Sequence, residues 1–159
     1  MSSFEESYLG QLRKLVGNRM LITPAVRVAI QDEQGAILLI RRSDNGKWGF
    51  PAGSMELDES VWDAMQREVK EETGLDVIAA TPIAVYSEPR FQFTNAFGGQ
   101  HQMLAFVFRV DEWCGKLLTE TDETIDARFF ALEELPELPP VYQETLADVA
   151  AFDGSLILK

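Results

Sequence analysis

The sequence predicts an α+β domain, an α/β/α sandwich in which a mixed β-sheet is flanked by helices. Three observations predict this fold class. A chain of 159 residues with 46% apolar residues is long enough for one domain with its own core. Segments rich in β-forming residues alternate with segments of helical periodicity, which favours a sheet covered by helices. Some β segments are joined by turn-like spacings and others by longer connections, which is typical of a mixed sheet.

The N-terminal segment 4–16 is predicted to be an amphipathic helix that ends near Gly17. Its apolar residues recur at helical spacing and comprise Phe4, Tyr8, Leu9, Leu12, Leu15 and Val16. Residues 21–30 and 36–41 are β-rich, and residues 32–35 between them are typical of a hairpin turn. We expect residues 1–20 to form a helical extension and residues 21–159 to form a single domain.

The rest of the chain repeats this alternation of β segments and helices. Residues 43–53 are rich in glycine and are expected to form a loop, and a helix over 59–73 follows, ending at Gly74. The remaining predicted elements are β segments at 76–88, 102–110 and 126–131, a loop at 94–100, and a last helix from about 140 to 151 after consecutive prolines.

Charge and composition exclude several classes of function. The net charge is −12, and no cluster of basic residues is larger than a pair such as Arg41-Arg42, so no nucleic-acid partner is expected. No apolar run approaches the roughly 18–20 residues that span a membrane, and the acidic N-terminus does not resemble a signal peptide. With Cys114 as its one cysteine, the chain cannot form an internal disulfide, and we expect it to be cytoplasmic.

The helix predicted over 59–73 carries three glutamates that work against its stability. Glu68, Glu71 and Glu72 fall within an arc of about 100° on the helix surface, at i,i+3 and i,i+4 spacings where like charges repel. Glu71 and Glu72 also lie in the last turn, where the helix dipole disfavours anions. A bound divalent cation would reverse both effects, because Mg²⁺ takes carboxylate oxygens as ligands. The alternative is a solvated acidic face.

The residues around these glutamates decide between the two interpretations. Residues 53–75 fit the pattern G-x5-E-x7-R-E-U-x-E-E-x-G-U, in which U is aliphatic, with a chance probability on the order of 10⁻⁷. The pattern is filled by Gly53, Glu59, Arg67, Glu68, Val69, Glu71, Glu72, Gly74 and Leu75. This segment resembles the Nudix box, and the chain is therefore similar to Nudix (MutT-like) hydrolases.

The resemblance extends over roughly residues 22–135. Residues 36–53 are similar to the strand and W-x-x-P-G-G loop that precede the box, and residues 123–135 are similar to the late strand of the family. Two residues depart from the usual pattern. Ala52 stands where the first glycine of the Gly-Gly pair is usual, and Asp58 stands where glycine usually precedes the box glutamate.

The resemblance implies a Nudix fold and a Mg²⁺-dependent hydrolase, with Mn²⁺ as an alternative ion, that cleaves a nucleoside diphosphate linked to another group. It assigns the metal to the Glu68, Glu71 and Glu72 carboxylates and the Gly53 carbonyl. Glu59, with Arg67, and Gly74 would stabilise the loop and helix.

The resemblance leaves the general base open between Glu68 and an acid of a later loop. Glu123, which would also ligate metal, is the candidate there, with Glu120 and Asp122 as rivals.

Substrate contacts are expected from Arg41, Trp48, Phe50 and Arg90, although for Trp48 and Phe50 packing in the core or the loop is the favoured interpretation. ADP-ribose-like and nucleoside-triphosphate-like substrates both remain open, and so does a homodimer formed through the N-terminal helix. A nucleotide-sensing domain without catalysis is the alternative function, but such domains usually lose box carboxylates. A diphosphate isomerase of the same fold would need further Cys and His residues that the sequence does not show.

Overall fold

Two β-sheets and the helices packed on them form the fold of residues 3–159, which the computed structural model describes. The larger sheet has the strand order β4-β1-β7-β5-β9, with β6 also paired to β7. Its strands are β1 (Leu21–Ala29), β4 (Ala52–Ser54), β5 (Asp76–Tyr86), β6 (Gln92–Thr94), β7 (Gln100–Cys114) and β9 (Ile157–Leu158). The smaller sheet has the order β3-β2-β8, with β2 (Ile37–Arg42), β3 (Trp48–Gly49) and β8 (Thr124–Phe130).

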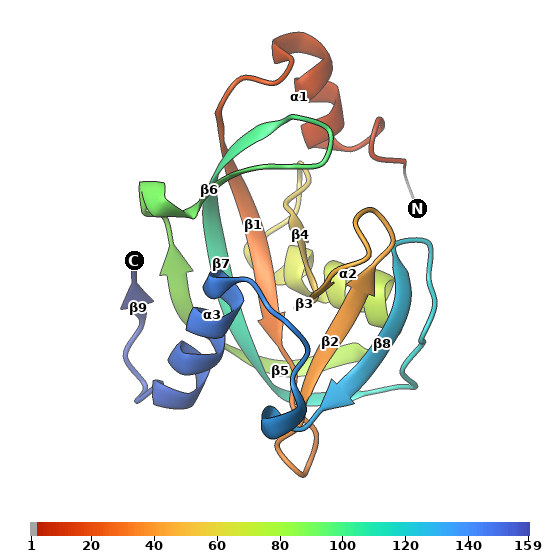
Figure 1. The fold of residues 1–159 in the computed structure, drawn as a ribbon, viewed down its shortest axis with the longest axis vertical. Coiled ribbons are helices and arrows are strands. Elements are labelled where there is room, and N and C mark those ends of the chain that lie inside the picture. Colours follow the sequence, from red (N-terminus) through yellow and green to blue (C-terminus); the bar gives the residue numbers. More distant parts are fainter. Residues whose placement is uncertain (1–2) are drawn as a thin grey trace.

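The larger sheet is mixed, as the sequence predicts, because β1 runs parallel to β7 while β5 runs antiparallel to β7. The helices are α1 (Tyr8–Val16), α2 (Val61–Thr73) and α3 (Pro140–Ala151), and two short 3-10 helices lie at Pro89–Phe91 and Leu132–Glu134. Figure 1 shows α3 in front of the strands, α2 behind them and α1 at one end. The predicted α/β/α arrangement is confirmed. None of the helices in the described residues is long and apolar enough to cross a membrane.

Strand β2 joins the two halves of the core. Leu38 and Ile40 on one of its faces pack in the cluster beneath α2. Ile37 and Leu39 on the other face pack in the cluster beneath α3. A strand that is buried on both faces is apolar at every position rather than at alternate ones, which explains the uninterrupted run from residue 37 to 40. The strand therefore fixes the position of α2 relative to α3.

Helix α2 has a well-defined start and end. The Ser60 hydroxyl accepts a hydrogen bond from the Asp63 N–H, and the Asp63 carboxylate accepts one from the Ser60 N–H. This capping box starts the helix at Val61, two residues later than predicted. In the same way, the Ser7 hydroxyl caps α1, so that this helix begins at Tyr8 and not at Phe4.

The strands missed by the sequence prediction are all short. Strand β3 lies inside the predicted loop 43–53 and β4 overlaps its end, β6 precedes the predicted loop 94–100 and shares only Thr94 with it, and β9 lies near the C-terminal residue. Each has two or three residues, which is too few to show a period-of-two pattern. Their existence depends on pairing with longer strands elsewhere in the chain, and that information is not local.

The turn at residues 32–35 forms as predicted, but its hairpin does not. The Asp32 carboxylate accepts hydrogen bonds from the N–H groups of Gln34 and Ala36, which closes the turn. The flanking strands then separate into different sheets and are joined only by an isolated bridge between Gln31 and Ile37. Burial of both faces of β2 under two helices requires this separation.

Gly74 ends α2 in the left-handed conformation, with φ of 77°. A Cβ at this position would lie 2.6 Å from Leu118 Cγ, so substitution adds a clash to the backbone strain. We expect Gly74→Ala to lower the free energy of unfolding by about 2–3 kcal/mol. Urea denaturation measures the change.

Gly35→Ala is the matched control for Gly74→Ala. Gly35 also has positive φ, at 81°, but a Cβ there would meet nothing within 4 Å. Gly35→Ala should therefore show the strain alone, about 1 kcal/mol. Equal losses for the two variants would show that the Leu118 contact contributes nothing.

Candidate active site

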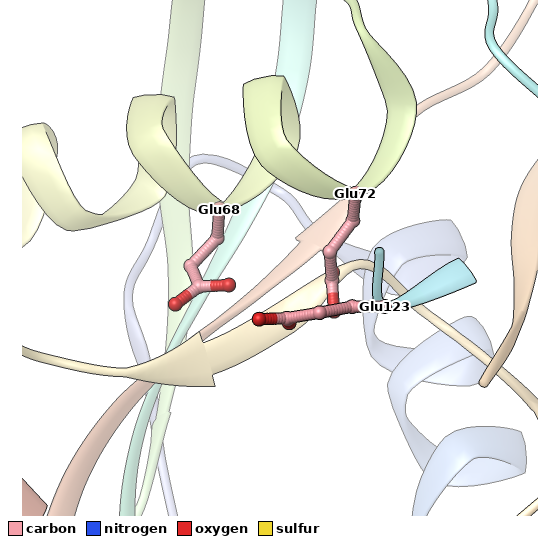
Figure 2. A group of neighbouring side chains, drawn as sticks. All are labelled: Glu68, Glu72 and Glu123. Atoms are coloured by element: carbon pink, nitrogen blue, oxygen red, sulfur yellow. The ribbon is translucent and has the colours of Figure 1, made fainter. Parts of the chain in front are cut away.

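Three carboxylates from distant parts of the chain converge at the C-terminal end of α2. Glu68 and Glu72 lie one turn apart on the helix, and Glu123 immediately precedes β8. One oxygen from each lies within 4.8 Å of the others, and Figure 2 shows the three side chains pointing toward a common space. Strand β8 brings Glu123 there because it pairs with β2, whose apolar residues pack against α2.

Glu68 is held by its neighbour on the helix and by the strand opposite. Its side chain is buried, with 6% of the residue exposed, and Arg67 Nη1 donates a hydrogen bond to Glu68 Oε1 at 2.7 Å. Gly53 on β4 lies directly against this carboxylate, and any Cβ at position 53 would overlap it. A side chain at position 53 would therefore displace the Glu68 carboxylate.

Glu72 is the most buried of the three acids, with 1% of the residue exposed. The backbone N–H of Ala52 donates a hydrogen bond to Glu72 Oε2 at 2.9 Å, and Arg42 Nη1 lies 3.6 Å from Glu72 Oε1. The Thr124 hydroxyl donates to the Glu72 carbonyl at 3.0 Å. Strand β4, strand β2 and the start of β8 thus all contact this one helix residue.

Glu123 differs from the other two acids in being exposed and free of partners. Within residues 3–159, its carboxylate accepts no hydrogen bond and forms no ion pair, whereas its backbone N–H donates to the Thr121 hydroxyl at 3.3 Å. The rival candidates Glu120 and Asp122 are not in the cluster that the described residues form. Glu123 is therefore the one acid whose side chain is free to move within the site.

Burial makes ionisation of these acids unfavourable. It raises the pKa of Glu68 to about 7, although Arg67 opposes the shift. Burial, and next the charge of Glu68, raise the pKa of Glu72 well above its ordinary value. The pKa of Glu123 is raised by partial burial and by the charge of Glu71. Carboxylates that share a site resist ionisation together unless positive charge lies between them.

The cluster has the chemistry of a site for a hard divalent cation. Its donor set consists of carboxylate oxygens, which Mg²⁺ and Mn²⁺ prefer. Arg42 and Arg67 supply part of the balancing positive charge, with Arg42 beside Glu72 and Arg67 beside Glu68. The residues present therefore fit the implied metal: Glu68 and Glu72 would hold it, and the Glu123 carboxylate reaches the same space.

Arg67 organises the acids around it. Its Nε and Nη2 atoms donate to the two oxygens of Glu59 at 2.9 and 2.7 Å, and Nη2 also donates to the Ser54 carbonyl at 3.1 Å. These contacts hold the pKa of Glu59 below its ordinary value and raise the pKa of the Arg67 guanidinium. Glu59 precedes the helix, which allows the pair to meet across eight positions in the sequence.

Asp58 occupies a position that favours glycine. Its φ is 65°, and it is the one residue other than glycine with a positive φ in the described chain. The resemblance places glycine at this position, and the backbone conformation explains why. Aspartate is among the residues that tolerate this region best, so the box turn forms in spite of the departure.

Glu71, predicted as a ligand, lies beside the cluster and outside the group of three. Its Oε2 is 3.4 Å from Arg67 Nη1 and its side chain is about a quarter exposed, at 27%. The structure thus brings two of the three helix glutamates together with Glu123.

Of the two adjacent arginines, it is Arg42 that faces the acids. Arg42 contacts Glu72 and also donates two hydrogen bonds to Asp44, both at 3.0 Å. Arg41, predicted to contact substrate, instead donates from Nε to the Gly46 carbonyl at 2.9 Å. Alternation along a strand places one of the two on each face, but the sequence does not say which.

The other predicted substrate residues make structural contacts. Phe50 is 1% exposed and packs edge-on against Tyr142 of α3, so it offers no surface to a substrate. Trp48 packs edge-on against Phe130 at 4.9 Å. Arg90 donates two hydrogen bonds to Glu144 at 2.8 Å and is fixed to α3.

Arg27 is a buried cation that the sequence prediction overlooked. It is 8% exposed, lies between the rings of Tyr86 and Tyr142, and donates to the Thr145 hydroxyl at 3.1 Å. Its Nε atom is buried without a hydrogen-bond partner among the described residues, and burial lowers its pKa. A lone arginine in the apolar segment 21–30 was the available signal.

Comparison with known proteins places these features in one family. The family model described as NUDIX domain matches residues 21–149. An ADP-ribose pyrophosphatase of Methanocaldococcus jannaschii is 34% identical over 140 residues, which cover 86% of this chain and 79% of that protein. A MutT-like protein of Streptomyces ambofaciens is 35% identical over 123 residues, covering 77% of this chain and 72% of that one.

Solved structures agree with the sequence relatives. The crystal structure of an ADP-ribose pyrophosphatase from Streptococcus suis superimposes with a TM-score of 0.63 and 28% identity. The superposition covers 87% of this chain and the whole of that one, at 100%. The similarity therefore extends over most of this chain.

The raised pKa of Glu68 predicts how stability depends on pH without metal. In EDTA, the unfolded chain loses this proton near pH 4.5 and the folded chain near pH 7, so the contribution of Glu68 to stability falls as pH rises between these values. Glu68→Gln has no proton to release at this position, so this fall in stability is absent from the variant. Its stability relative to the native chain should rise by about 2–3 kcal/mol between pH 4 and pH 8.

Urea denaturation at several pH values measures this difference, and Mg²⁺ provides the second arm of the experiment. At pH 8 the ion should stabilise the native chain more than Glu68→Gln, because only the native chain keeps the full acid cluster. Stability curves that run parallel for the two proteins would contradict the prediction.

Proposed function

The chain belongs to the Nudix family, and on that premise we propose that it is a metal-dependent pyrophosphohydrolase acting on a nucleoside diphosphate linked to another group. The observation that carries the proposal is the cluster of Glu68, Glu72 and Glu123 beside an intact set of box residues. A pyrophosphatase must bring water to a polyanion, and a group of clustered carboxylates that favours a divalent cation suits that task.

We propose ADP-ribose as the first substrate to test. Two of the similar proteins, from M. jannaschii and S. suis, are named ADP-ribose pyrophosphatases. Hydrolysis would add water across the P–O–P bridge, giving AMP and ribose 5-phosphate. One phosphorus receives the oxygen of water, and the bridging oxygen leaves with the other.

The three acids would have separate tasks. Glu68 and Glu72 are fixed by Arg67 and by the Ala52 N–H, so they suit the holding of a metal in one geometry. Bound Mg²⁺ or Mn²⁺ supplies the charge that neutralises phosphoryl oxygens and lowers the pKa of water. Glu123, whose carboxylate has no partner among the described residues, suits the role of general base that accepts the proton of the attacking water.

Retention of every box carboxylate argues against the alternative of a nucleotide sensor that does not catalyse. The packing at Gly53 adds to this, because the lack of a side chain there leaves room for the Glu68 carboxylate. A sensor that had lost catalysis would have no need to keep a costly buried acid.

A substrate panel tests the proposal. With Mg²⁺, the native chain should release AMP from ADP-ribose, and EDTA should abolish the release. Nucleoside triphosphates, dinucleoside polyphosphates and NADH belong in the same panel, with product identity determined by chromatography. Nucleotides that raise the melting temperature without being hydrolysed would instead support the sensor.

The proposed division of tasks predicts different losses for two variants. Glu123→Gln should lower kcat by about 10²–10⁴-fold while leaving Mn²⁺ affinity within a few-fold of the native value. Glu72→Gln should lower turnover by several orders of magnitude and weaken Mn²⁺ binding as well. Calorimetry or Mn²⁺ electron paramagnetic resonance measures affinity without turnover. If Glu123→Gln loses Mn²⁺ binding as fully as Glu72→Gln, Glu123 is a ligand and the base lies elsewhere.

A further inference from the structure

Helix α1 lies outside the residues that the family model matches, yet it contacts the turn that leads into α2. The backbone N–H of Tyr8 donates a hydrogen bond to Glu56 Oε2 at 2.8 Å. Tyr8 is the first residue of α1, where N–H groups have no partner within the helix and the helix dipole favours a carboxylate. Glu56 therefore caps α1 from a distant part of the sequence.

The backbone of the same residue contacts the box. The Glu56 N–H donates to Glu59 Oε1 at 2.7 Å, and Glu59 gives both of its oxygens to Arg67. Arg67 in turn donates to Glu68 at 2.7 Å. A continuous series of polar contacts thus runs from the start of α1 to a carboxylate of the metal cluster.

The turn that carries Glu56 includes a residue in an unfavourable backbone conformation. Asp58, two residues further on, has a φ of 65°, a conformation that costs free energy for a residue with a side chain. Apolar packing between α1 and this turn is incomplete. A cavity of about 340 Å³ lies between them, lined by Leu9 and Leu12 of the helix and by Met55 and Leu57 of the turn. The hydrogen bond from the Tyr8 N–H to Glu56 joins the start of α1 directly to this turn.

We propose that Glu56 is a positioning residue through which α1 holds the box turn, and with it Glu59, Arg67 and Glu68, in the geometry that binds metal. This inference rests on the proposed function of the acid cluster. Glu56 itself touches none of the three clustered acids, so its effect would pass through Glu59 and Arg67.

The hydrogen bond can be removed from either side in the full chain. Glu56→Ala removes the acceptor. Tyr8→Pro removes the donor, and proline fits this position because the first turn of a helix tolerates it and Ser7 before it is already extended, with ψ of 157°. Tyr8→Ala is the matched control, because it loses the ring but keeps the N–H. Glu56→Gln is the conservative variant, because its amide oxygen still accepts.

Glu56→Ala and Tyr8→Pro should each lower kcat and Mn²⁺ affinity by about tenfold with little change in KM for substrate. The double variant should lose no more than either single one, since both remove the same contact. Tyr8→Ala and Glu56→Gln should stay within about twofold of the native chain. Leu57→Ala, in the same turn but 66% exposed, should also behave like the native chain.

Exchange of the Arg67 Nε–H proton, followed by NMR, provides a readout that does not depend on turnover. It should be faster in Glu56→Ala and Tyr8→Pro than in their controls. If the native chain hydrolyses no substrate, the proposed function fails, while Mn²⁺ affinity and Nε–H exchange still decide the role of Glu56. The inference would be overturned if Glu56→Ala and Tyr8→Pro kept the native Mn²⁺ affinity and the native Nε–H exchange rate. It would also be overturned if Tyr8→Ala lost as much Mn²⁺ affinity as Tyr8→Pro.

Discussion

The guanidinium of Arg67 is the group on which the geometry of the site depends. It bridges Glu59, which lies before α2, to Glu68, which lies within the helix, and it also contacts the Ser54 carbonyl on β4. Its planar fork of donors suits this task, since each nitrogen has a fixed direction. A lysine would supply the charge but not the three directions. The loop, the helix and the strand opposite are thereby fixed relative to one another by one side chain.

The same group limits the cost of burying acids. Glu68 and Glu72 are nearly inaccessible, burial raises the pKa of both, and the charge of Glu68 raises the pKa of Glu72 further. Arg67 and Arg42 offset part of this repulsion without entering the space between the acids. The protein thus keeps a local excess of negative charge that serves no purpose in its own stability. Such an arrangement is expected where a cation completes the structure during function.

The sequence predicted the long elements of this fold and the residue types of the site, but not how the site is closed. The period of α2 and the box pattern were local signals, so Glu68, Glu72 and Arg67 could be named from the chain alone. The strands β3 and β4 could not be predicted, because segments of two or three residues show no period. They form only by pairing, β3 with β2 and β4 with β1. For the same reason, the sequence did not reveal that the Ala52 N–H contacts Glu72, or that Arg42 and not Arg41 faces the acids. Phe50 was ambiguous because burial beneath α3 depends on a helix about ninety residues later, at Pro140–Ala151.

A short strand can therefore contribute several contacts to this site although the sequence does not predict the strand. Strand β4 has three residues, yet it supplies the Ala52 N–H to Glu72, the bare backbone of Gly53 to Glu68 and the Ser54 carbonyl to Arg67. Successive side chains of a strand point to opposite faces of the sheet. Backbone N–H and C=O groups do not alternate in this way, and a glycine has no side chain to direct. One residue after another can then contact the same helix. That use of backbone in place of side chains explains how so short a segment holds three residues of α2, and why substitutions that preserve its side-chain character can still displace the acids.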